Sequence, residues 1–197
     1  MTFKLGLTGS IGMGKSTTAR MFADLGCAIW DADAAVHRLY SLGGAAVPEM
    51  RKAFPDSIVE GAVDRSVLRQ IISVDATALS RIEKIVHPLV ACDRAVFSET
   101  AESDIAIFDM PLLFETGANR EMDAIACVYV PDDVQQERVL NRGTMTKEQF
   151  LNINVRQMPI AEKCKKADYV IETDTLAHAR LQVDRIVMDI RTGNASA

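Results

Sequence analysis

Residues 9–16 have the types and the spacing needed to hold a chain of phosphates. They fit the pattern G-x-x-x-x-G-K-[ST]. Glycine lets the backbone turn tightly, so successive N–H groups can approach phosphate oxygens. The Lys15 ammonium can reach the β- and γ-phosphates, and the Ser16 hydroxyl can bind Mg²⁺. We therefore expect a nucleotide to contact the following residues: Gly12, Met13, Gly14, Lys15, Ser16 and Thr17.

The phosphate-binding pattern does not choose a reaction, because GTPases, ATPases and kinases share it. A guanine-specific protein should carry Asn-Lys-x-Asp, which this sequence lacks. A motor or transporter ATPase would be longer and would need neighbouring subunits. An ATP-dependent kinase with a small acceptor is therefore the favoured class. A nucleotide-dependent switch or binding protein without turnover is the alternative, and no recognisable switch motif supports it.

Two carboxylates, Asp31 and Asp33, follow the second apolar run of the chain. The ligand crevice of a parallel sheet lies at the carboxyl ends of its strands, so we expect Asp33 to face the phosphates and to take the proton of the acceptor hydroxyl. A plain helix N-cap is the alternative for Asp33. His37 lies one helical turn beyond it and is either a substrate contact or a buried structural histidine.

A third acid, Asp109, ends the apolar run at residues 105–108. An acid at this position of a phosphate-binding fold orders the Mg²⁺ shell, and we expect Asp109 to do so through water. A turn aspartate is the alternative.

Two arginines, Arg138 and Arg142, lie four residues apart on one predicted helix face. We expect Arg142 to close over the γ-phosphate and offset charge in the transition state, and Arg138 to contact the substrate. A solvated basic face beside Glu137 is the ordinary alternative. The predicted lid covers residues 138–157, and Thr146 with Gln149 forms a capping box inside it. Further cations, some of which we expect to meet substrate phosphate, are Arg156, Lys163, Lys165 and Lys166.

Five apolar runs predict strands, at residues 3–8, 27–30, 105–108, 124–130 and 169–171. Helical spacing separates them, first at residues 15–25, where Gly26 is expected to end the helix. This alternation predicts an α/β protein with a parallel sheet covered on both faces. A strand before the phosphate-binding pattern and a helix after it disfavour an incidental glycine-rich turn.

The stretch between the second and third strands lacks strand signals and is too long for a plain crossover. Two helical stripes occupy it, at residues 67–72 and 79–89, with Asp75 as the expected N-cap of the second. We interpret it as a helical substrate-binding insertion; a helical cover without a ligand is the alternative.

The composition is that of an ordinary globular protein: 197 residues, 48% hydrophobic and 25% charged. A net charge of −5 argues against nucleic acid or an anionic membrane as a partner. The four cysteines form no Cys-x-x-Cys pair and fit a reducing cytoplasm. No obligatory protein partner is evident from the sequence.

The combined pattern resembles the dephospho-coenzyme A kinase family along nearly the whole chain. The matching segments are residues 6–17, Asp31-Ala32-Asp33, Ile85-Val86-His87-Pro88, residues 109–115 (Asp-Met-Pro-Leu-Leu-Phe-Glu), Gln157-Met158-Pro159 and residues 167–171 (Ala-Asp-Tyr-Val-Ile). The segments most specific to this family are residues 109–115 and the His87-Pro88 pair, which is expected at the end of the inserted helix.

The resemblance implies a three-layer P-loop kinase fold and transfer of the ATP γ-phosphate to the 3′-hydroxyl of dephospho-CoA, the last step of coenzyme A synthesis. It implies a nucleotide-binding core at residues 1–40 and 101–197, a helical CoA-binding insertion at residues 58–98, and an arginine-bearing lid. Asp33 would be the base, and His87 would contact the substrate.

The sequence departs from the family pattern in two places. The family usually has Gly and Ser where this chain has Ser10 and Met13, a small change because the main chain makes the contacts there. The family commonly has Asp-Asn where this chain has Glu172-Thr173, so its adenine contacts are not carried over. A kinase resembling shikimate kinase is the nearest alternative, and the long insertion and the run from Asp109 count against it.

Overall fold

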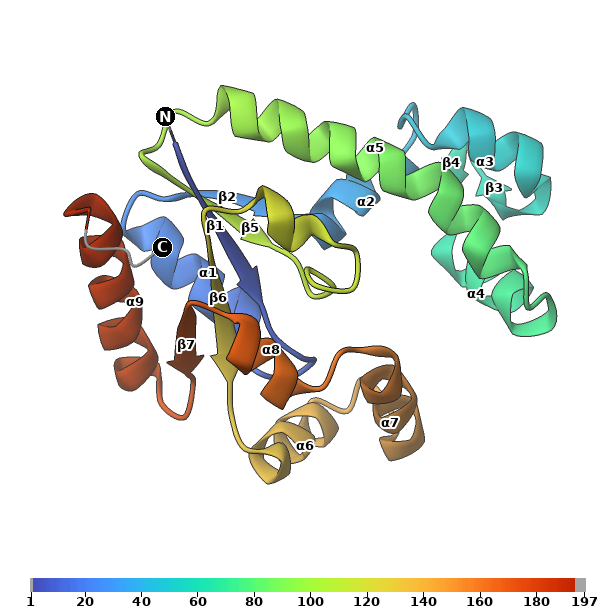
Figure 1. Ribbon diagram of the computed structural model, residues 1–197. Helices are drawn as coiled ribbons and strands as arrows, with labels where there is room; N and C mark the ends of the chain where they lie inside the picture. The colour runs from blue at the N-terminus through green and yellow to red at the C-terminus, as the bar shows by residue number, and fades with distance from the viewer. Residues whose placement is uncertain (1, 194–197) are drawn as a thin grey trace. The chain divides into compact units, whose positions relative to one another are not determined.

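The computed structural model describes residues 2–193, except for the side chain of Arg156. The chain divides into two compact units (Figure 1). One comprises the chain up to Trp30 and from Ala101 onward, and the other comprises Asp31–Thr100. The first boundary therefore falls before helix α2 (Ala32–Tyr40), instead of after residue 40.

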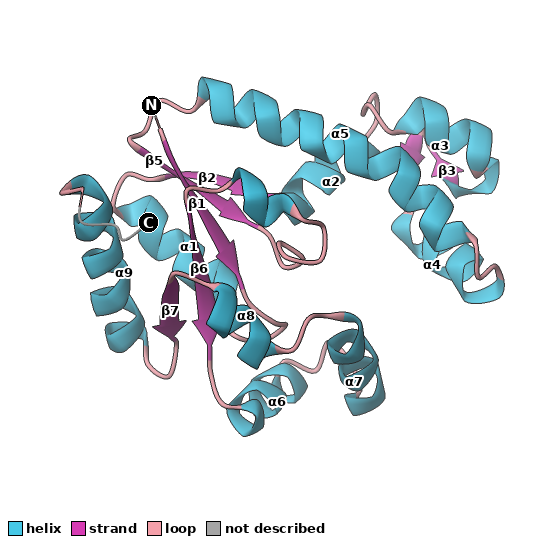
Figure 2. Cartoon of the chain, viewed as in Figure 1, coloured by secondary structure: helices cyan, strands magenta, loops and turns pink. Residues whose placement is uncertain are grey.

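A five-stranded sheet forms the centre of the first unit, in the order β2-β5-β1-β6-β7 (Figure 2). β1 pairs in parallel with β5 and β6, and β6 pairs in parallel with β7. The strands are β1 (Phe3–Thr8), β2 (Ala28–Asp31), β5 (Ile105–Asp109), β6 (Ala124–Tyr129) and β7 (Tyr169–Glu172). The predicted α/β class with a parallel sheet is confirmed, because every predicted apolar run coincides with one of these strands.

Helices cover both faces of this sheet, as the apolar strands require. Alternate residues of β6, such as Ala126 and Val128, join the core beneath α1 (Lys15–Asp24) and α9 (Leu176–Arg191). Helices α1 and α9 pack against each other (Figure 1). Cys127 points to the other face, where α8 (Ile160–Lys166) packs on β6.

Helix α1 ends as the sequence predicts, at a glycine in the left-handed region. Gly26 has a φ of 85°. The Gly26 N–H donates to Ala23 O and the Cys27 N–H donates to Phe22 O, which together satisfy the last carbonyls of the helix. The turn leads the chain directly into β2.

The second unit has its own hydrophobic core, which includes Met50, Leu68, Ile82 and Val86. Its helices are α2, α3 (Val47–Ala53), the short 3₁₀ helix η1 (Pro55–Ser57), α4 (Arg65–Val74) and α5 (Ala78–Thr100). The two helical stripes of the sequence lie in α4 and α5. Asp75 ends α4 and accepts the Thr77 N–H, so its expected role as the N-cap of α5 is wrong by two residues.

The structure corrects two further expectations in this unit. A small hairpin, β3 (Ile58–Val59) with β4 (Ala62–Val63), lies where no strand was predicted. Its strands are too short for an alternating pattern, and its turn uses Glu60 and Gly61, both at positive φ. Pro88 lies inside α5 and not at its end, since the helix continues to Thr100. Proline has no backbone N–H, so the carbonyl oxygen of Lys84, four residues earlier, lacks its usual helical hydrogen-bond donor. Lys84 is exposed.

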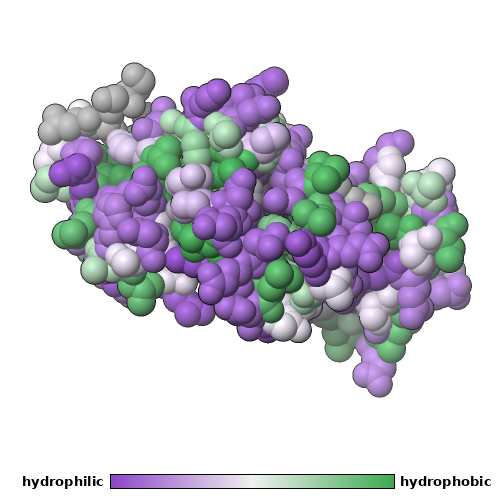
Figure 3. Space-filling model, turned by 90° about the horizontal axis from the view of Figure 1, so that it is seen from below, coloured by the Kyte–Doolittle hydropathy of each residue, from purple (hydrophilic) through white to green (hydrophobic). Residues whose placement is uncertain are grey.

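The remaining helices of the first unit follow β5 and β6. They are the 3₁₀ helix η2 (Ala118–Glu121), α6 (Asp132–Asn141) and α7 (Lys147–Arg156). The predicted capping box is confirmed, because Thr146 and Gln149 exchange both hydrogen bonds at the start of α7. Among the described residues, no helix combines the length and apolar character needed to cross a membrane. Hydrophilic residues cover most of the face seen in Figure 3, with hydrophobic ones scattered among them.

Candidate nucleotide-binding site

The loop between β1 and α1 is shaped to bind anions. Helix α1 begins at Lys15, directly after Gly14, whose φ of 89° lies in the left-handed region. The first N–H groups of a helix have no acceptor within the helix, and the helix dipole adds positive charge at the same end. Ser16 and Thr17 are exposed in this first turn. The arrangement favours a phosphate group at the start of α1.

Gly12 leaves no room for a side chain, and a side chain at Gly14 would be crowded. Gly12 has a φ of 81°, and a Cβ there would lie 2.4 Å from Val139 Cγ2 of α6. A Cβ on Gly14 would lie 3.1 Å from Thr173 Oγ1, just after β7. Met13, between them, buries its side chain in the sheet core. Residue 13 therefore serves the site through its main chain only.

Two loop carbonyls accept hydrogen bonds from distant side chains. Gln135 Nε2 of α6 donates to Ile11 O at 2.7 Å. Thr173 Oγ1 donates to Met13 O at 2.8 Å. Residues far along the chain therefore hold the backbone of the loop.

The lysine of the loop forms an ion pair with the acid at the end of β5. Lys15 Nζ contacts Asp109 Oδ1, and the Asp109 side chain is buried. Asp109 is the last residue of β5 and not a residue of the following turn. The pair places one carboxylate and one ammonium beside the loop, where a metal-bound triphosphate would require both.

A pocket of about 210 Å³ opens beside the loop. It brings together three groups of residues: the phosphate-binding loop and α1, the two predicted arginines, and the turn from β7 into α9. Its lining consists of Gly12, Gly14, Thr17, Thr18, Met21, Arg138, Arg142, Thr173, Asp174, Thr175, Leu176 and Ala179. A pocket that joins an anion-binding loop to a partly apolar wall suits a nucleotide.

The two arginines of α6 occupy different settings. Arg138 donates from Nη2 to Thr173 O at 2.7 Å and from Nη1 to Thr173 Oγ1 at 3.2 Å. Its guanidinium is thus bonded to the turn after β7, and the solvated-face alternative is wrong for this residue. Arg142 ends α6 and is exposed. Arg142 lines the pocket with an exposed side chain.

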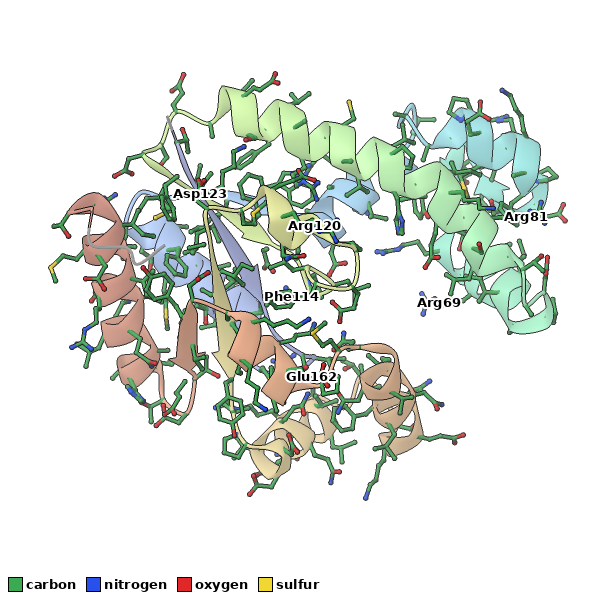
Figure 4. The ribbon with its side chains drawn as sticks, in the orientation of Figure 1. Arg69, Arg81, Phe114, Arg120, Asp123 and Glu162 are labelled. Carbon is green, nitrogen blue, oxygen red and sulfur yellow. The ribbon has the colours of Figure 1, made fainter. Side chains whose placement is uncertain are left out.

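One of the four candidate phosphate-binding cations, Lys163, has other partners. The Lys163 side chain is fully buried and donates to Pro111 O at 2.7 Å, while its ammonium lies 2.9 Å from Glu115 Oε1. Lys166 lies over the Phe114 ring, 5.9 Å from its centroid. Lys163 and Lys166 belong to α8. Figure 4 labels Glu162 on this helix and Phe114 on the segment after β5. Lys165 is exposed, and the Arg156 side chain lies outside the described residues.

Hydrogen bonding and burial shift several pKa values in this unit. Burial raises the pKa of Glu115, but hydrogen bonds from Met158 N and Lys163 outweigh it, so the net pKa is lowered. Burial raises the pKa of the Cys127 thiol, and the nearby Cys164 thiol reinforces that shift. The two sulfur atoms lie 3.8 Å apart. These thiols stay protonated at neutral pH.

The predicted site residues of the second unit are exposed at helix positions. Asp31 is the N-cap of α2 and accepts the Ala34 N–H at 2.8 Å, so the capping role falls to Asp31 and not to Asp33. Asp33 lies in the first turn of α2 with an exposed side chain. His37 is exposed too, so the buried structural alternative is wrong. His87 is exposed on α5.

Sequence reasoning missed Gln135 as a site residue and gave Thr173 no role beyond a departure from the family pattern. Gln135 had one usable signal: it lies four residues before Val139 and three before Arg138, so the three side chains share a face of the predicted helix. Among the described residues, no cluster of three His, Cys, Asp or Glu side chains could hold a metal ion. Mg²⁺ needs no such cluster, since it usually binds through one or two protein oxygens, substrate phosphates and water.

The fold and the site define a P-loop nucleotide-binding protein: a parallel sheet whose first strand leads through a phosphate-binding loop into a helix, with a lysine–aspartate pair beside it. Comparisons with known proteins narrow this class. A family model described as "Dephospho-CoA kinase" matches residues 3–178. A curated protein of Ruegeria pomeroyi, named Dephospho-CoA kinase, is 64% identical over 197 residues, which is all of both chains. The chain therefore belongs to the dephospho-CoA kinase family.

Solved structures agree with this assignment. A protein from Thermus thermophilus has a TM-score of 0.85 at 29% identity, covering 95% of this chain and 96% of its own. A dephospho-CoA kinase from Campylobacter jejuni has a TM-score of 0.71 at 25% identity, covering 98% of this chain and all of its own.

Proposed function

We propose that this chain transfers the γ-phosphate of ATP to the 3′-hydroxyl of dephospho-CoA, giving CoA and ADP. Membership of the dephospho-CoA kinase family carries the proposal, and the anion-binding loop with its adjoining pocket supports it. The acceptor is an alcohol, so the protein must place that hydroxyl in line with the γ-phosphate and stabilise charge as the phosphoryl group moves.

ATP with Mg²⁺ is the proposed nucleotide. The amides of the loop and the Lys15 ammonium would hold the β- and γ-phosphates. The exposed Ser16 hydroxyl would bind Mg²⁺ directly, and Asp109 would reach it through water. Bound there, Mg²⁺ supplies charge neutralisation on the phosphate oxygens. The nucleoside would occupy the pocket between α1 and the turn after β7.

We assign the chemistry of the acceptor to side chains of the second unit. Asp33 would take or orient the proton of the acceptor hydroxyl, a role favoured by its exposed carboxylate and by the capping of α2 by Asp31. His37 and His87 would contact the substrate, and the helical insertion would hold its CoA portion. Arg142 would stabilise the transferring phosphate, since its side chain is exposed at the pocket.

The proposed location is the cytoplasm. The described cysteines are free thiols, which is the usual state in a reducing compartment. Dephospho-CoA and ATP are the proposed partners.

A coupled assay of ADP release tests the function. Purified protein with Mg-ATP should turn over dephospho-CoA, and the product should comigrate with authentic CoA. Turnover of shikimate or AMP, with none of dephospho-CoA, would refute the proposal.

A further inference from the structure

Two buried polar side chains from different elements bond to carbonyls of the phosphate-binding loop. Gln135 is 1% exposed and Thr173 is 8% exposed. A buried polar group destabilises the fold unless it finds a partner. Gln135 Nε2 finds Ile11 O at 2.7 Å, and Thr173 Oγ1 finds Met13 O at 2.8 Å.

Because a peptide bond is planar, a hydrogen bond to a loop carbonyl also fixes the direction of the N–H group of the next residue. A trans peptide is planar, so the C=O of one residue and the N–H of the next point in opposite directions. The bond to Ile11 O therefore turns the Gly12 N–H away from Gln135. In the same way, the bond to Met13 O turns the Gly14 N–H away from Thr173.

We propose that Gln135 and Thr173 are positioning residues, which keep the Gly12 and Gly14 amides aimed at the triphosphate. Both glycines line the pocket. The proposal rests on the proposed use of ATP and deepens it: these two residues act through the loop main chain and not by bonding the phosphates themselves.

The Thr173 hydroxyl has a defined orientation. Arg138 Nη1 lies 3.2 Å from Thr173 Oγ1, and a guanidinium can only donate. Thr173 Oγ1 is therefore the acceptor of that bond. Its single proton is then directed to Met13 O, which fixes the direction of the bond on which the proposal depends.

One face of α6 provides most of this support. Gln135 and Arg138 lie three residues apart and Val139 lies four residues after Gln135, so the three side chains share a face. Val139 occupies the space where a Gly12 Cβ would lie. The loop therefore rests on a regular helix, which is stiffer than a loop packed against another loop.

A purely structural role for these hydrogen bonds predicts a different result from a positioning role. Lost structural bonds would lower thermal stability and leave ligand preferences unchanged. Lost positioning would weaken polyphosphate binding and leave the nucleoside and the acceptor unaffected. Inorganic tripolyphosphate and adenosine, used separately as competitive inhibitors against ATP, distinguish the two cases.

The test uses the full chain and three variants: Thr173→Val, which keeps the shape without the hydroxyl; Thr173→Ser, which keeps the hydroxyl; and Gln135→Met, which keeps the length without the donor. For Thr173→Val and Gln135→Met we expect the tripolyphosphate Ki and the KM for ATP to rise about five- to tenfold, the size of one hydrogen bond. For Gln135→Met, whose side chain does not line the pocket, the adenosine Ki and the KM for dephospho-CoA should stay within about twofold of the unmodified chain, and Thr173→Ser should resemble the unmodified chain throughout.

Gln182→Leu is the matched control. Gln182 exchanges two hydrogen bonds with the backbone of Glu172, donating to its O at 2.9 Å and accepting from its N–H at 3.0 Å, so its loss removes bonds next to Thr173 without touching the loop. Its inhibition constants should not change. An unchanged tripolyphosphate Ki in folded variants, or an equal rise for adenosine in Gln135→Met, would overturn the proposal.

If Thr173→Val does not fold, Gln135→Met alone decides the question by the same criterion. An unmodified chain that binds neither ATP nor tripolyphosphate would instead refute the proposed function.

Discussion

The ammonium of Lys163 lies 2.9 Å from Glu115 Oε1, and none of the lysine side chain is exposed. The same ammonium donates to Pro111 O at 2.7 Å, and Glu115 also accepts the Met158 N–H at 2.8 Å. One buried cation thus joins α8, the segment after β5 and the turn before α8. This segment begins beside Asp109, so the pair holds the backbone that follows a proposed metal-site residue.

Removing one partner of the Lys163–Glu115 pair should lower the free energy of unfolding by an amount that depends on which partner is removed. Glu115→Gln leaves a buried ammonium without a counter-charge, and we expect it to lower the free energy of unfolding by about 2 kcal/mol. Lys163→Met leaves a carboxylate that is 21% exposed and can bind water, so we expect a loss of about 1 kcal/mol. Urea unfolding of both variants measures these losses.

The double variant completes the cycle. The combined loss should fall short of the sum of the single losses by at least about 1 kcal/mol, because the two groups interact directly. Lys52→Met is the surface control, since its pair with Glu49 is 72% and 57% exposed, and it should cost less than about 0.5 kcal/mol. Additive losses at Lys163 and Glu115 would contradict a coupled pair.

Glu115 should also contribute to stability in a pH-dependent way. Its pKa in the folded chain is lowered from the ordinary value of 4.5, so the folded state favours the ionised form. This stabilisation is complete above that value and is lost as the pH falls through the lowered folded pKa. Between about pH 5 and pH 3, Glu115→Gln should therefore lose stability less steeply than the unmodified chain. Parallel slopes in acid urea titrations would exclude this contribution.

Local patterns predicted much of this fold because short-range chemistry causes it. The strands, the Gly26 helix stop and the Thr146 capping box each depend on residues close together in sequence. The phosphate-binding loop is predictable for the same reason.

The side chains that hold the phosphate-binding loop do so through contacts between residues far apart in the sequence, which local patterns do not predict. Gln135 bonds to a carbonyl 124 positions away, and Thr173 bonds to one 160 positions away. Its charge makes Lys163 one of four candidates for contact with substrate phosphate, yet its partners, Glu115 and Pro111, follow β5 and come to it only through the sheet topology.

Asp33→Asn tests the proposed base. The amide keeps the shape but cannot take the proton, so kcat should fall at least about 10²-fold. Since Asp31 caps α2, the fold should be unaffected, and the affinity for ATP should be unchanged. Steady-state kinetics and ATP titration measure both quantities, and near-normal turnover would remove Asp33 from the mechanism.

The two arginines of α6 should separate into different kinetic classes. Arg142→Ala should lower kcat about 10²-fold with little change in stability, because the side chain is exposed and would act on developing charge. Arg138→Ala should raise the KM for ATP and lower the melting temperature, because its guanidinium holds the turn after β7. Arg185→Ala, exposed on α9, is the control and should behave as the unmodified chain. Identical profiles for the two variants would contradict separate roles.

Lys15→Ala should reduce kcat/KM by at least about 10²-fold, because it removes the ammonium expected at the γ-phosphate. It also leaves the buried Asp109 without this ion-pair partner, so unfolding measurements must accompany the kinetics. A variant with unchanged kcat/KM would show that the loop does not hold the nucleotide.

The order of the loop and its hydrogen-bond partners along the chain has a consequence for synthesis on the ribosome. Translation produces residues 9–16 long before residues 135 and 173, whose side chains form hydrogen bonds with the backbone carbonyls of this loop. A chain cut after residue 160 keeps the whole glycine-rich motif but also loses β7 and α9, which supply core residues such as Ile171 and Val183, so we predict that it neither folds nor binds tripolyphosphate in a titration. A nascent polypeptide would then bind the triphosphate fully only after residue 173 has been added.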